Sequence, residues 1–224
     1  MTGKRKTSRE KLKKIILMAV FAALAYVSLF LTSYFPKISG FLTLDIKDAV
    51  ITLGAMFLGP VAAILISLVV SLIEMVTIST TEFWGFLMNF LGSAVFAAVA
   101  SWIYKYKKTF LGGIMGLVCG SISMVVVMIL CDLFIIPLYT PGVTSEVVAG
   151  MILPTLLPFN AIKAILNSAL VMFLYKPVSN ALKASRAIDR RKNEKLTIDG
   201  RTLVIMAVAL VIVVASALIL FLVI

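Results

Sequence analysis

The stretch DAVITLGAMFLGPVAAILISLVVSLIEMVTI, residues 48–78, decides how this chain folds. It is apolar over 31 residues, whereas an ordinary membrane helix needs about 20. Gly59 and Pro60 interrupt it, and a proline inside a helix breaks or sharply kinks that helix. The stretch therefore predicts either one long, bent membrane crossing or two helices that turn at Gly59-Pro60.

The basic residues decide between these two topologies. Three basic segments separate the apolar runs: KRKTSREKLKK at 4–14, YKYKK at 104–108, and the segment 176–201. Lys and Arg concentrate in the cytoplasmic loops of membrane proteins, so the N-terminus is placed in the cytoplasm. If residues 48–78 cross once, the second and third segments fall outside. If they form two helices, all three fall inside and hold 18 of the 21 Lys and Arg residues.

We therefore predict two helices, of which the first is unusually short. A helix over 48–58 measures about 16 Å, roughly half the thickness of the hydrocarbon layer. The backbone of such a helix must be shielded by protein or begin in the outer loop. The other predicted spans are 15–35, 83–103, 109–131, 154–175 and 202–224.

The composition agrees with an all-α, polytopic membrane helical bundle, because 62% of the residues are hydrophobic and the mean hydropathy is +1.12. The net charge of +11 sits at the junctions between apolar runs, which lipid anchoring explains without nucleic acid. The expected organisation is a basic cytoplasmic N-terminus (1–14), a six-helix core (15–183), a basic cytoplasmic linker (184–201) and an additional transmembrane helix (202–224). The C-terminus is then expected outside the cell.

On this topology, polar residues from separate segments reach the outer half of the membrane. Asn160, Lys163 and Asn167 are spaced i, i+3 and i+7, so they share one face of the sixth core helix. A charge within the membrane usually has a partner or faces a cavity. We therefore expect a single outward-facing substrate chamber, formed by Asp45, Asp48, Glu74, Asn89, Asn160, Lys163 and Asn167.

Simpler interpretations remain open for each residue. Lys163 can extend its ammonium group to the interface, and Asn160 and Asn167 can hydrogen-bond between helices. Glu74 can be partly exposed at the end of its helix. The segment 133–153 is expected to form an outer loop that either covers the chamber or merely connects two helices.

Small residues four apart allow helices to approach closely in lipid. Ala19 and Ala23 form such a pair on the first helix, where they are a candidate docking face for a separate subunit. Similar rows in later helices are expected to serve internal packing: Gly112, Gly116 and Gly120, and Ser93, Ala97 and Ser101.

Several classes of site are not favoured. The chain contains no histidine, and its two cysteines, 12 residues apart in one predicted helix, are too distant to bridge. No glycine-lysine phosphate loop and no pairing of a nucleophile with a base is present. We expect no enzyme activity, no catalytic residues, no metal site and no cofactor.

Three elements resemble a known family. These are FLTLDIKDAVITLGAMFLGPVAAILISLVVSLIE (41–74) with its Leu-Asp-x-x-Asp start, the PLY of 137–139, and LPFNAIKAILNS (157–168). They resemble the substrate-binding S components of energy-coupling factor (ECF) vitamin transporters, and within them the riboflavin-specific subgroup. The resemblance covers about residues 12–183, so the helix 202–224 lies outside it.

The resemblance implies a function and partners. It implies capture of riboflavin from the extracellular side for ATP-driven uptake, with Asn160 and Lys163 contacting the vitamin and Ala19 and Ala23 docking on the transmembrane coupling subunit. Two cytoplasmic ATPases would bind the ATP. Two alternatives stay open: an S component for another vitamin, such as pantothenate or a pyrimidine or thiamine precursor, and a small secondary transporter that works alone.

Overall fold

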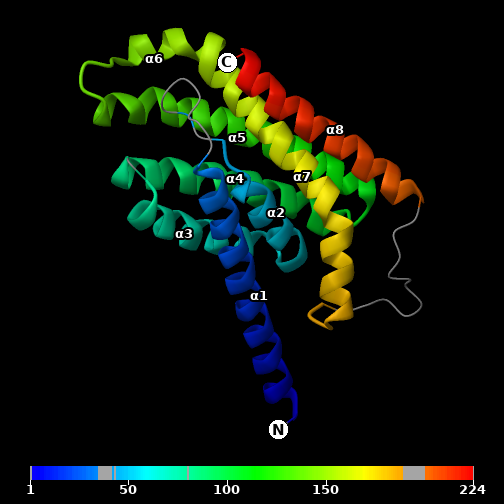
Figure 1. The fold of residues 1–224 in the computed structure, drawn as a ribbon. Coiled ribbons are helices and arrows are strands. Elements are labelled where there is room, and N and C mark those ends of the chain that lie inside the picture. The colour runs from blue at the N-terminus through cyan, green and yellow to red at the C-terminus, as the bar shows by residue number, and fades with distance from the viewer. Residues whose placement is uncertain (1, 35–41, 43, 80, 189–199, 224) are drawn as a thin grey trace.

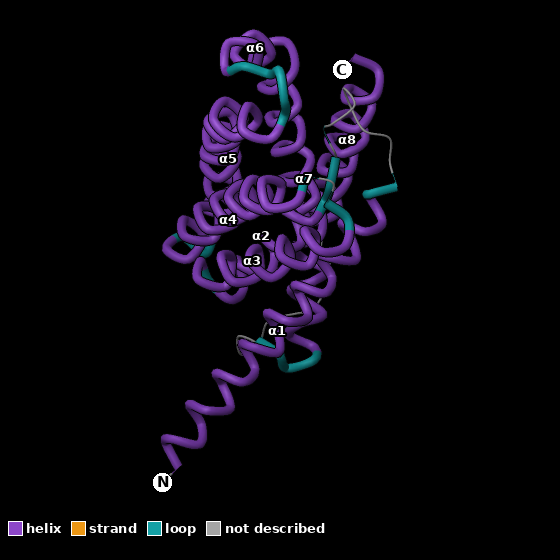
Figure 2. The backbone as a smooth tube through the Cα atoms, turned by 90° about the vertical axis from the view of Figure 1, so that its left-hand side faces the viewer, coloured by secondary structure: helices purple, strands orange, loops and turns teal. Residues whose placement is uncertain are grey.

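The computed structural model describes residues 2–34, 42, 44–79, 81–188 and 200–223, and these fold into one helical bundle (Figures 1 and 2). The helices are α1 (Thr2–Thr32), α2 (Lys47–Leu58), α3 (Pro60–Thr77), α4 (Glu82–Tyr106), α5 (Phe110–Tyr139), α6 (Ser145–Met151), α7 (Leu157–Ala184) and α8 (Gly200–Val223). A π-helical turn, Ile152–Leu156, joins α6 to α7. Within the described residues, five helical segments are long and apolar enough to cross a membrane.

The prediction of two helices within 48–78 is confirmed. The chain turns at Gly59, whose φ of 102° favours glycine, and Pro60 occupies the first turn of α3. The short helix α2 is shielded as expected, because its residues from Lys47 to Ala55 are mostly buried and it contacts α1, α3, α4 and α7. The backbone of a helix too short to cross the membrane is thereby surrounded by protein.

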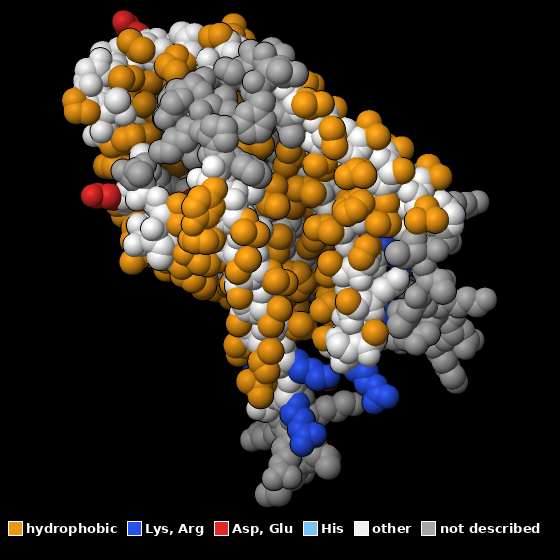
Figure 3. Space-filling view, in the orientation of Figure 1, with side chains coloured by type: hydrophobic (Ala, Val, Ile, Leu, Met, Phe, Trp, Pro, Cys, Tyr) orange, Lys and Arg blue, Asp and Glu red, His pale blue; other side chains and the backbone are white. Residues whose placement is uncertain are grey.

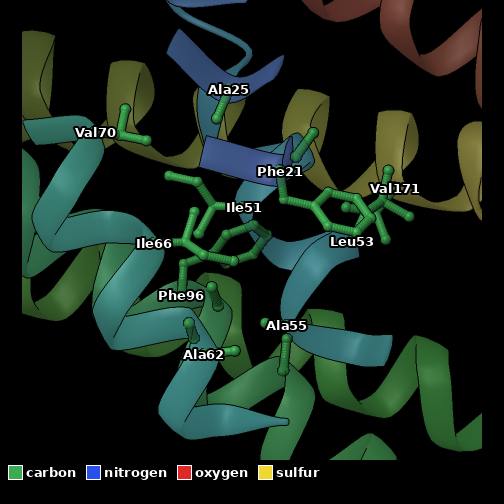
Figure 4. Packing of buried hydrophobic residues seen from close by; sticks show 14 of the residues in the cluster. Phe21, Ala25, Ile51, Leu53, Ala55, Ala62, Ile66, Val70, Phe96 and Val171 are labelled. Carbon is green, nitrogen blue, oxygen red and sulfur yellow. The ribbon is translucent and has the colours of Figure 1, made fainter. Parts of the chain in front are cut away.

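A hydrophobic core surrounds α2 (Figure 4). Its fully buried members include Ile51 on α2, Val70 on α3 and Phe96 on α4, and α1 contributes Phe21 and Ala25. The ring of Phe21 lies directly over Gly54, where an added Cβ would be 2.7 Å from the ring. A glycine at position 54 therefore lets α1 pack closely on α2.

The predicted packing role of the glycine row on α5 is confirmed for two of its members. A Cβ at Gly116 would lie 2.6 Å from the carbonyl oxygen of Ala100, and one at Gly120 would lie 2.8 Å from that of Phe96. Both oxygens belong to the backbone of α4, which cannot move away as a flexible side chain can. These glycines therefore set the distance between α4 and α5.

We expect Gly116→Ala to lower the free energy of unfolding by about 1–3 kcal/mol, because the new methyl group overpacks the contact with α4. Gly113→Ala is the matched control: it brings the same gain in helix propensity, but its Cβ would meet only Tyr104, at 3.8 Å. Thermal unfolding in detergent compares the two variants. Equal melting temperatures would contradict this account of the packing.

The predicted outer loop over 133–153 is wrong for much of its length. Helix α5 continues to Tyr139, and α6 follows after a turn in which Gly142 has a φ of 83°. Pro137 does not end α5, because near a helix end its missing N–H frees only the carbonyl group of Leu133. The hydroxyl group of Ser145 donates to that oxygen at 3.3 Å. Apolar contacts among Ile136, Val148 and Leu156 then hold the short helix α6 in place.

Helices α1 and α8 are the first and the last helix of the chain. Helix α1 begins at Thr2 instead of 15, because the basic segment 4–14 is rich in good helix formers. Helix α8 runs back along α7 (Figure 1), with Ala209 and Ser216 buried on it. The predicted linker 184–201 falls largely on residues 189–199, outside the described part of the chain.

The described parts of the basic segments lie at one end of the bundle. The Lys13 ammonium group donates to the carbonyl oxygen of Arg186 at 3.3 Å, so the start of α1 and the end of α7 are neighbours. Lys108 and Lys176 line one cavity near this end. In Figure 3, Lys and Arg side chains gather at the lower end, below a broad apolar surface. This is the charge distribution expected of a membrane protein.

Candidate functional site

Six of the seven polar residues predicted to form a chamber are linked by ion pairs or hydrogen bonds in one cluster, and Asn160 lies one turn before Lys163 on the same helix. All seven are buried except Asn89, which is half-buried. The cluster forms where α2 begins, α3 ends and α7 begins, at the end of the bundle opposite the basic segments. Four elements contribute to it: α2 with the residues just before it, α3, α4 and α7.

Lys163 of α7 is held by carboxylates. Its Nζ donates to Asp45 Oδ2 at 2.7 Å and lies 3.9 Å from Asp48 Oδ2. The other oxygen of Asp48 accepts a hydrogen bond from the hydroxyl group of Ser93 on α4. Lys163 does not reach the interface, so the structure favours a paired lysine over one that extends its ammonium group to the membrane surface.

A second ion pair lies beside the first. Lys47 Nζ is 2.5 Å from Glu74 Oε2 and 4.0 Å from Asp45 Oδ2, and the residue is 1% exposed. The remaining oxygen of Glu74 accepts from Asn89 Nδ2 at 2.8 Å. Glu74 is thus buried and satisfied, and is not a helix-end residue exposed to solvent.

Asn167 joins α2 to α7. Its Oδ1 accepts from the backbone N–H of Ala49 at 2.8 Å, which satisfies one of the first-turn donors of α2. No side chain caps α2 from Ile46, the residue before the helix. The Nδ2 of Asn167 donates to the carbonyl oxygens of Asp45 and Lys163. Asn167 therefore acts as glue between segments, as the alternative interpretation proposed, and it positions both members of the Asp45–Lys163 pair.

Asn160 forms a separate branch next to the π-helical turn. Its Nδ2 donates to the carbonyl oxygen of Leu156 at 2.9 Å and to Asp132 Oδ2 at 3.4 Å. Asp132 is buried on α5, four residues before Ile136, whose apolar contacts anchor α6. The helical irregularity at 152–156 thus lies beside polar side chains, as such irregularities often do at functional sites.

The sequence analysis missed two members of the cluster. Lys47 is one of the three basic residues outside the three basic segments and was given no role. Its ammonium group nevertheless forms an ion pair with Glu74, 27 residues further along the chain. Ser93 was assigned to helix packing, although its hydroxyl group binds Asp48. The i, i+3, i+7 spacing identified the residues of α7, but no comparable pattern marks a pair formed between two helices.

The cluster holds more carboxyl groups than ammonium groups, and one of its buried oxygen atoms has no hydrogen-bond donor among the described residues. Three carboxylates, Asp45, Asp48 and Glu74, face the ammonium groups of Lys47 and Lys163. Asp45 Oδ1 is buried and has no hydrogen-bond partner among the described residues. Buried polar atoms are nearly always satisfied, so this oxygen can accept a hydrogen bond from a ligand. A cluster of this kind suits a polar ligand without negative charge.

A cavity of about 540 Å³ lies elsewhere, near the basic end of the bundle. Its lining residues come from α2, α4, α5 and the turn between them, α7 and α8, and none of them belongs to the polar cluster. The polar residues that the sequence analysis identified and this cavity therefore lie at different levels of the bundle.

Comparisons with known proteins agree on one family. The family model for the substrate-specific component of ECF transporters matches residues 13–175. The riboflavin transporter RibU of Staphylococcus aureus (strain TCH60) is 32% identical over 188 residues, covering 82% of this chain and 99% of the relative. The riboflavin transporter FmnP of Bacillus subtilis (strain 168) is 22% identical over 173 residues, covering 74% of this chain and 91% of that relative.

A solved structure is also similar. It is reported as the structure and mechanism of the S component of a bacterial ECF transporter, and it aligns with a TM-score of 0.64 at 33% identity. The alignment covers 77% of this chain and 99% of that structure. The likeness therefore spans nearly all of the solved S component and leaves part of this chain unmatched.

Proposed function

This chain belongs to the family of substrate-specific components of ECF transporters, and we propose that it captures riboflavin at the polar cluster from the extracellular side. Members of this family are components of membrane transporters and are not enzymes. The observation that carries the proposal is the buried pair of Asp45 and Lys163, with the buried Asn160 one turn away on α7, in a chain that matches a riboflavin transporter over 82% of its length.

The chemistry of the cluster supports this ligand. The flavin ring presents two carbonyl acceptors and one ring N–H donor, and its ribityl chain carries hydroxyl groups. Lys163 has three N–H donors, of which Asp45 engages one at 2.7 Å. Asp45 Oδ1 supplies an acceptor. A few placed polar groups of this kind, within otherwise apolar walls, fix the orientation of a ligand.

The same charges help to separate riboflavin from other vitamins. Pantothenate carries a carboxylate, and burial of this charge beside the carboxyl groups of Asp45 and Asp48 would be unfavourable. Riboflavin is uncharged, so it meets no such penalty. Thiamine is a cation that the acids would attract, so thiamine and its pyrimidine precursor are included as competitors in the test below.

Purified protein titrated with vitamins tests the ligand. We expect tight binding of riboflavin, seen as quenching of flavin fluorescence, and no displacement by excess pantothenate, thiamine or its pyrimidine precursor. Preferential binding of one of these competitors would keep the family and overturn the ligand. Uptake of riboflavin by vesicles containing this chain alone, without ATP, would instead favour a transporter that works alone.

We propose further that this chain works with a transmembrane coupling subunit and two cytoplasmic ATPases, which supply the energy. Ala19 and Ala23 support the first contact, because both are exposed on α1 while Ala22 and Ala25 face the core. Two exposed small side chains four residues apart leave a shallow surface on which a partner helix can pack closely.

We expect Ala19→Leu/Ala23→Leu to lower ATP-dependent uptake by roughly 10-fold or more, because overpacking a helix contact costs about 1–3 kcal/mol. Riboflavin binding should not change, since neither residue lies in the polar cluster. Leu24→Phe enlarges another exposed side chain of α1 at a different angle and serves as the control. The readout is riboflavin uptake after reconstitution with the coupling module. Equal loss in the control would argue against a specific docking face.

The proposed orientation places the N-terminus in the cytoplasm and the C-terminus outside. The contact between Lys13 and Arg186 supports a common side for the start of α1 and the end of α7. Helix α8 then returns along α7 to the opposite side. A cysteine introduced at Lys105 in a variant lacking the two native cysteines should react with impermeant reagents only after cells are opened.

A further inference from the structure

The cavity near the basic end of the bundle is lined by both polar and apolar side chains. Four polar residues, which we call the mouth, are Lys108, Lys176, Thr109 and Tyr104. The wall is formed by Phe110, Ile114, Leu117, Val171, Met172 and Ile205. At about 540 Å³, the cavity falls within the usual range for the binding of one small ligand.

The two lysines give the mouth a net positive charge. No carboxylate is among the lining residues, and neither Lys108 nor Lys176 forms an ion pair with a described residue. Lys108 is exposed and Lys176 is half-buried. The hydroxyl groups of Tyr104 and Tyr175 bind each other at the edge of the cavity, where they fix the neighbouring parts of α4 and α7. The mouth is therefore suited to an anion.

The position of the cavity along the bundle indicates that the anion is a lipid headgroup. Lys108 lies in the turn between two membrane-spanning helices, and the exposed ring of Phe110 follows it at the start of α5. A lysine and an aromatic ring at the end of a membrane span are expected at the boundary between the headgroups and the acyl chains, here on the basic side of the bundle. A ligand that enters here from the membrane meets charge first and apolar side chains next.

Helix α8 completes the cavity. Thr202 and Ile205 of its first turns line it, and α8 lies beyond residue 175, where the family match ends. The additional helix therefore adds a wall to the surface between α5 and α7, which becomes a partly open groove. No part of the riboflavin proposal requires this groove, because it shares no residue with the polar cluster.

We propose that this groove binds an anionic phospholipid, with the phosphate between Lys108 and Lys176 and one acyl chain along Phe110, Ile114 and Ile205. Basic pockets between transmembrane helices on the cytoplasmic side are suited to anionic headgroups. The apolar wall supplies the part of the site that a free phosphate could not use. Helix α8 is the element that makes lipid capture possible.

Native mass spectrometry of the full-length protein tests the proposal, with phosphatidylglycerol and phosphatidylcholine of identical acyl chains as probes. We expect wild-type protein to retain phosphatidylglycerol preferentially. In Lys108→Gln/Lys176→Gln this preference should fall by about 10-fold or more, since each lysine near an anionic headgroup contributes on the order of a factor of five. The matched control is Lys105→Gln/Lys107→Gln, which removes two exposed lysines from the same end that do not line the groove.

A second variant tests the apolar wall. Gly113→Leu adds a side chain at a residue that lines the groove, and its Cβ meets only ordinary contacts with Tyr104. We expect it to weaken retention of phosphatidylglycerol while riboflavin binding and monodispersity stay as in the wild type. Inorganic phosphate and glycerol phosphate, added as soluble probes, should not displace the lipid.

Each other outcome overturns the proposal. An equal effect of the two double variants would assign the preference to the general surface charge. An unchanged preference in Lys108→Gln/Lys176→Gln, or full retention in Gly113→Leu, would show that the groove is not the lipid site. Displacement by soluble phosphate would identify a site for a free anion. Riboflavin binding, measured in parallel, reports separately on the proposed vitamin site.

Discussion

Lys163→Met is expected to lower the affinity for riboflavin by roughly 10- to 150-fold while the protein remains folded. A hydrogen bond to a charged group contributes about 1.5–3 kcal/mol, which corresponds to this range. Lys163 lies 2.7 Å from Asp45, and its remaining donors are available to a ligand. Fluorescence titration of the purified variant with riboflavin measures the loss, and its elution profile in size-exclusion chromatography reports on folding.

A double variant separates ligand binding from structural support. Lys163→Met alone also removes the ammonium partner of the buried Asp45. The next ammonium group, that of Lys47, is 4.0 Å from Asp45, so this variant is expected to be folded but less stable than the wild type. In Asp45→Asn/Lys163→Met both charges are gone, and stability should recover toward that of the wild type. Riboflavin binding should not recover. Wild-type affinity in the double variant would show that the pair only holds α7 to α2.

Lys47→Met should destabilise the protein by about 3–5 kcal/mol, because it leaves Glu74 buried without its ammonium partner. The Lys47 ammonium group lies 2.5 Å from that carboxylate, and Lys47 is buried at the start of α2. The expected result is a large drop in melting temperature, or a failure to obtain monodisperse protein. Thermal unfolding in detergent gives the measurement.

Two further variants test the cause of this loss. Lys47→Met/Glu74→Gln removes the unpaired charge and should be more stable than Lys47→Met alone, because Asn89 can still bind the amide at position 74. Lys105→Met removes an exposed lysine and should change the stability little. A double variant as unstable as Lys47→Met would mean that packing of the long side chain matters more than its charge.

The topology could be predicted because it is a counting problem. The side on which each basic segment falls depends only on the number of crossings before it, so Lys105 and the segment 176–201 together require the turn at Gly59-Pro60. The convergence of Asp48, Asn89 and Lys163 followed once those crossings were fixed. The helical spacing of residues 160, 163 and 167 gave the face of α7 without further information.

Other features depend on contacts that a sequence does not display. Lys47 pairs with Glu74 because α2 packs on α3. From the sequence alone, a lysine beside Asp45 at the start of a membrane helix is more typical of a residue at the membrane surface. The continuation of α5 beyond 133 depends on Ser145, whose hydroxyl group binds the oxygen that Pro137 leaves unpaired. The groove beside α8 exists only because a helix from the far end of the chain covers α7.

The hydrogen bond between Asn167 and Ala49 spans 118 residues, so it can form only after α7 has been synthesised. Helix α2 emerges from the ribosome long before α7, which brings both the amide that completes its first turn and the ammonium group that neutralises Asp45. Before that, Asp45 and Asp48 lack the ammonium group of Lys163, and we expect these two charges to keep the beginning of α2 in contact with water. We expect the hairpin of α2 and α3 to settle to its final depth only after translation has passed residue 167.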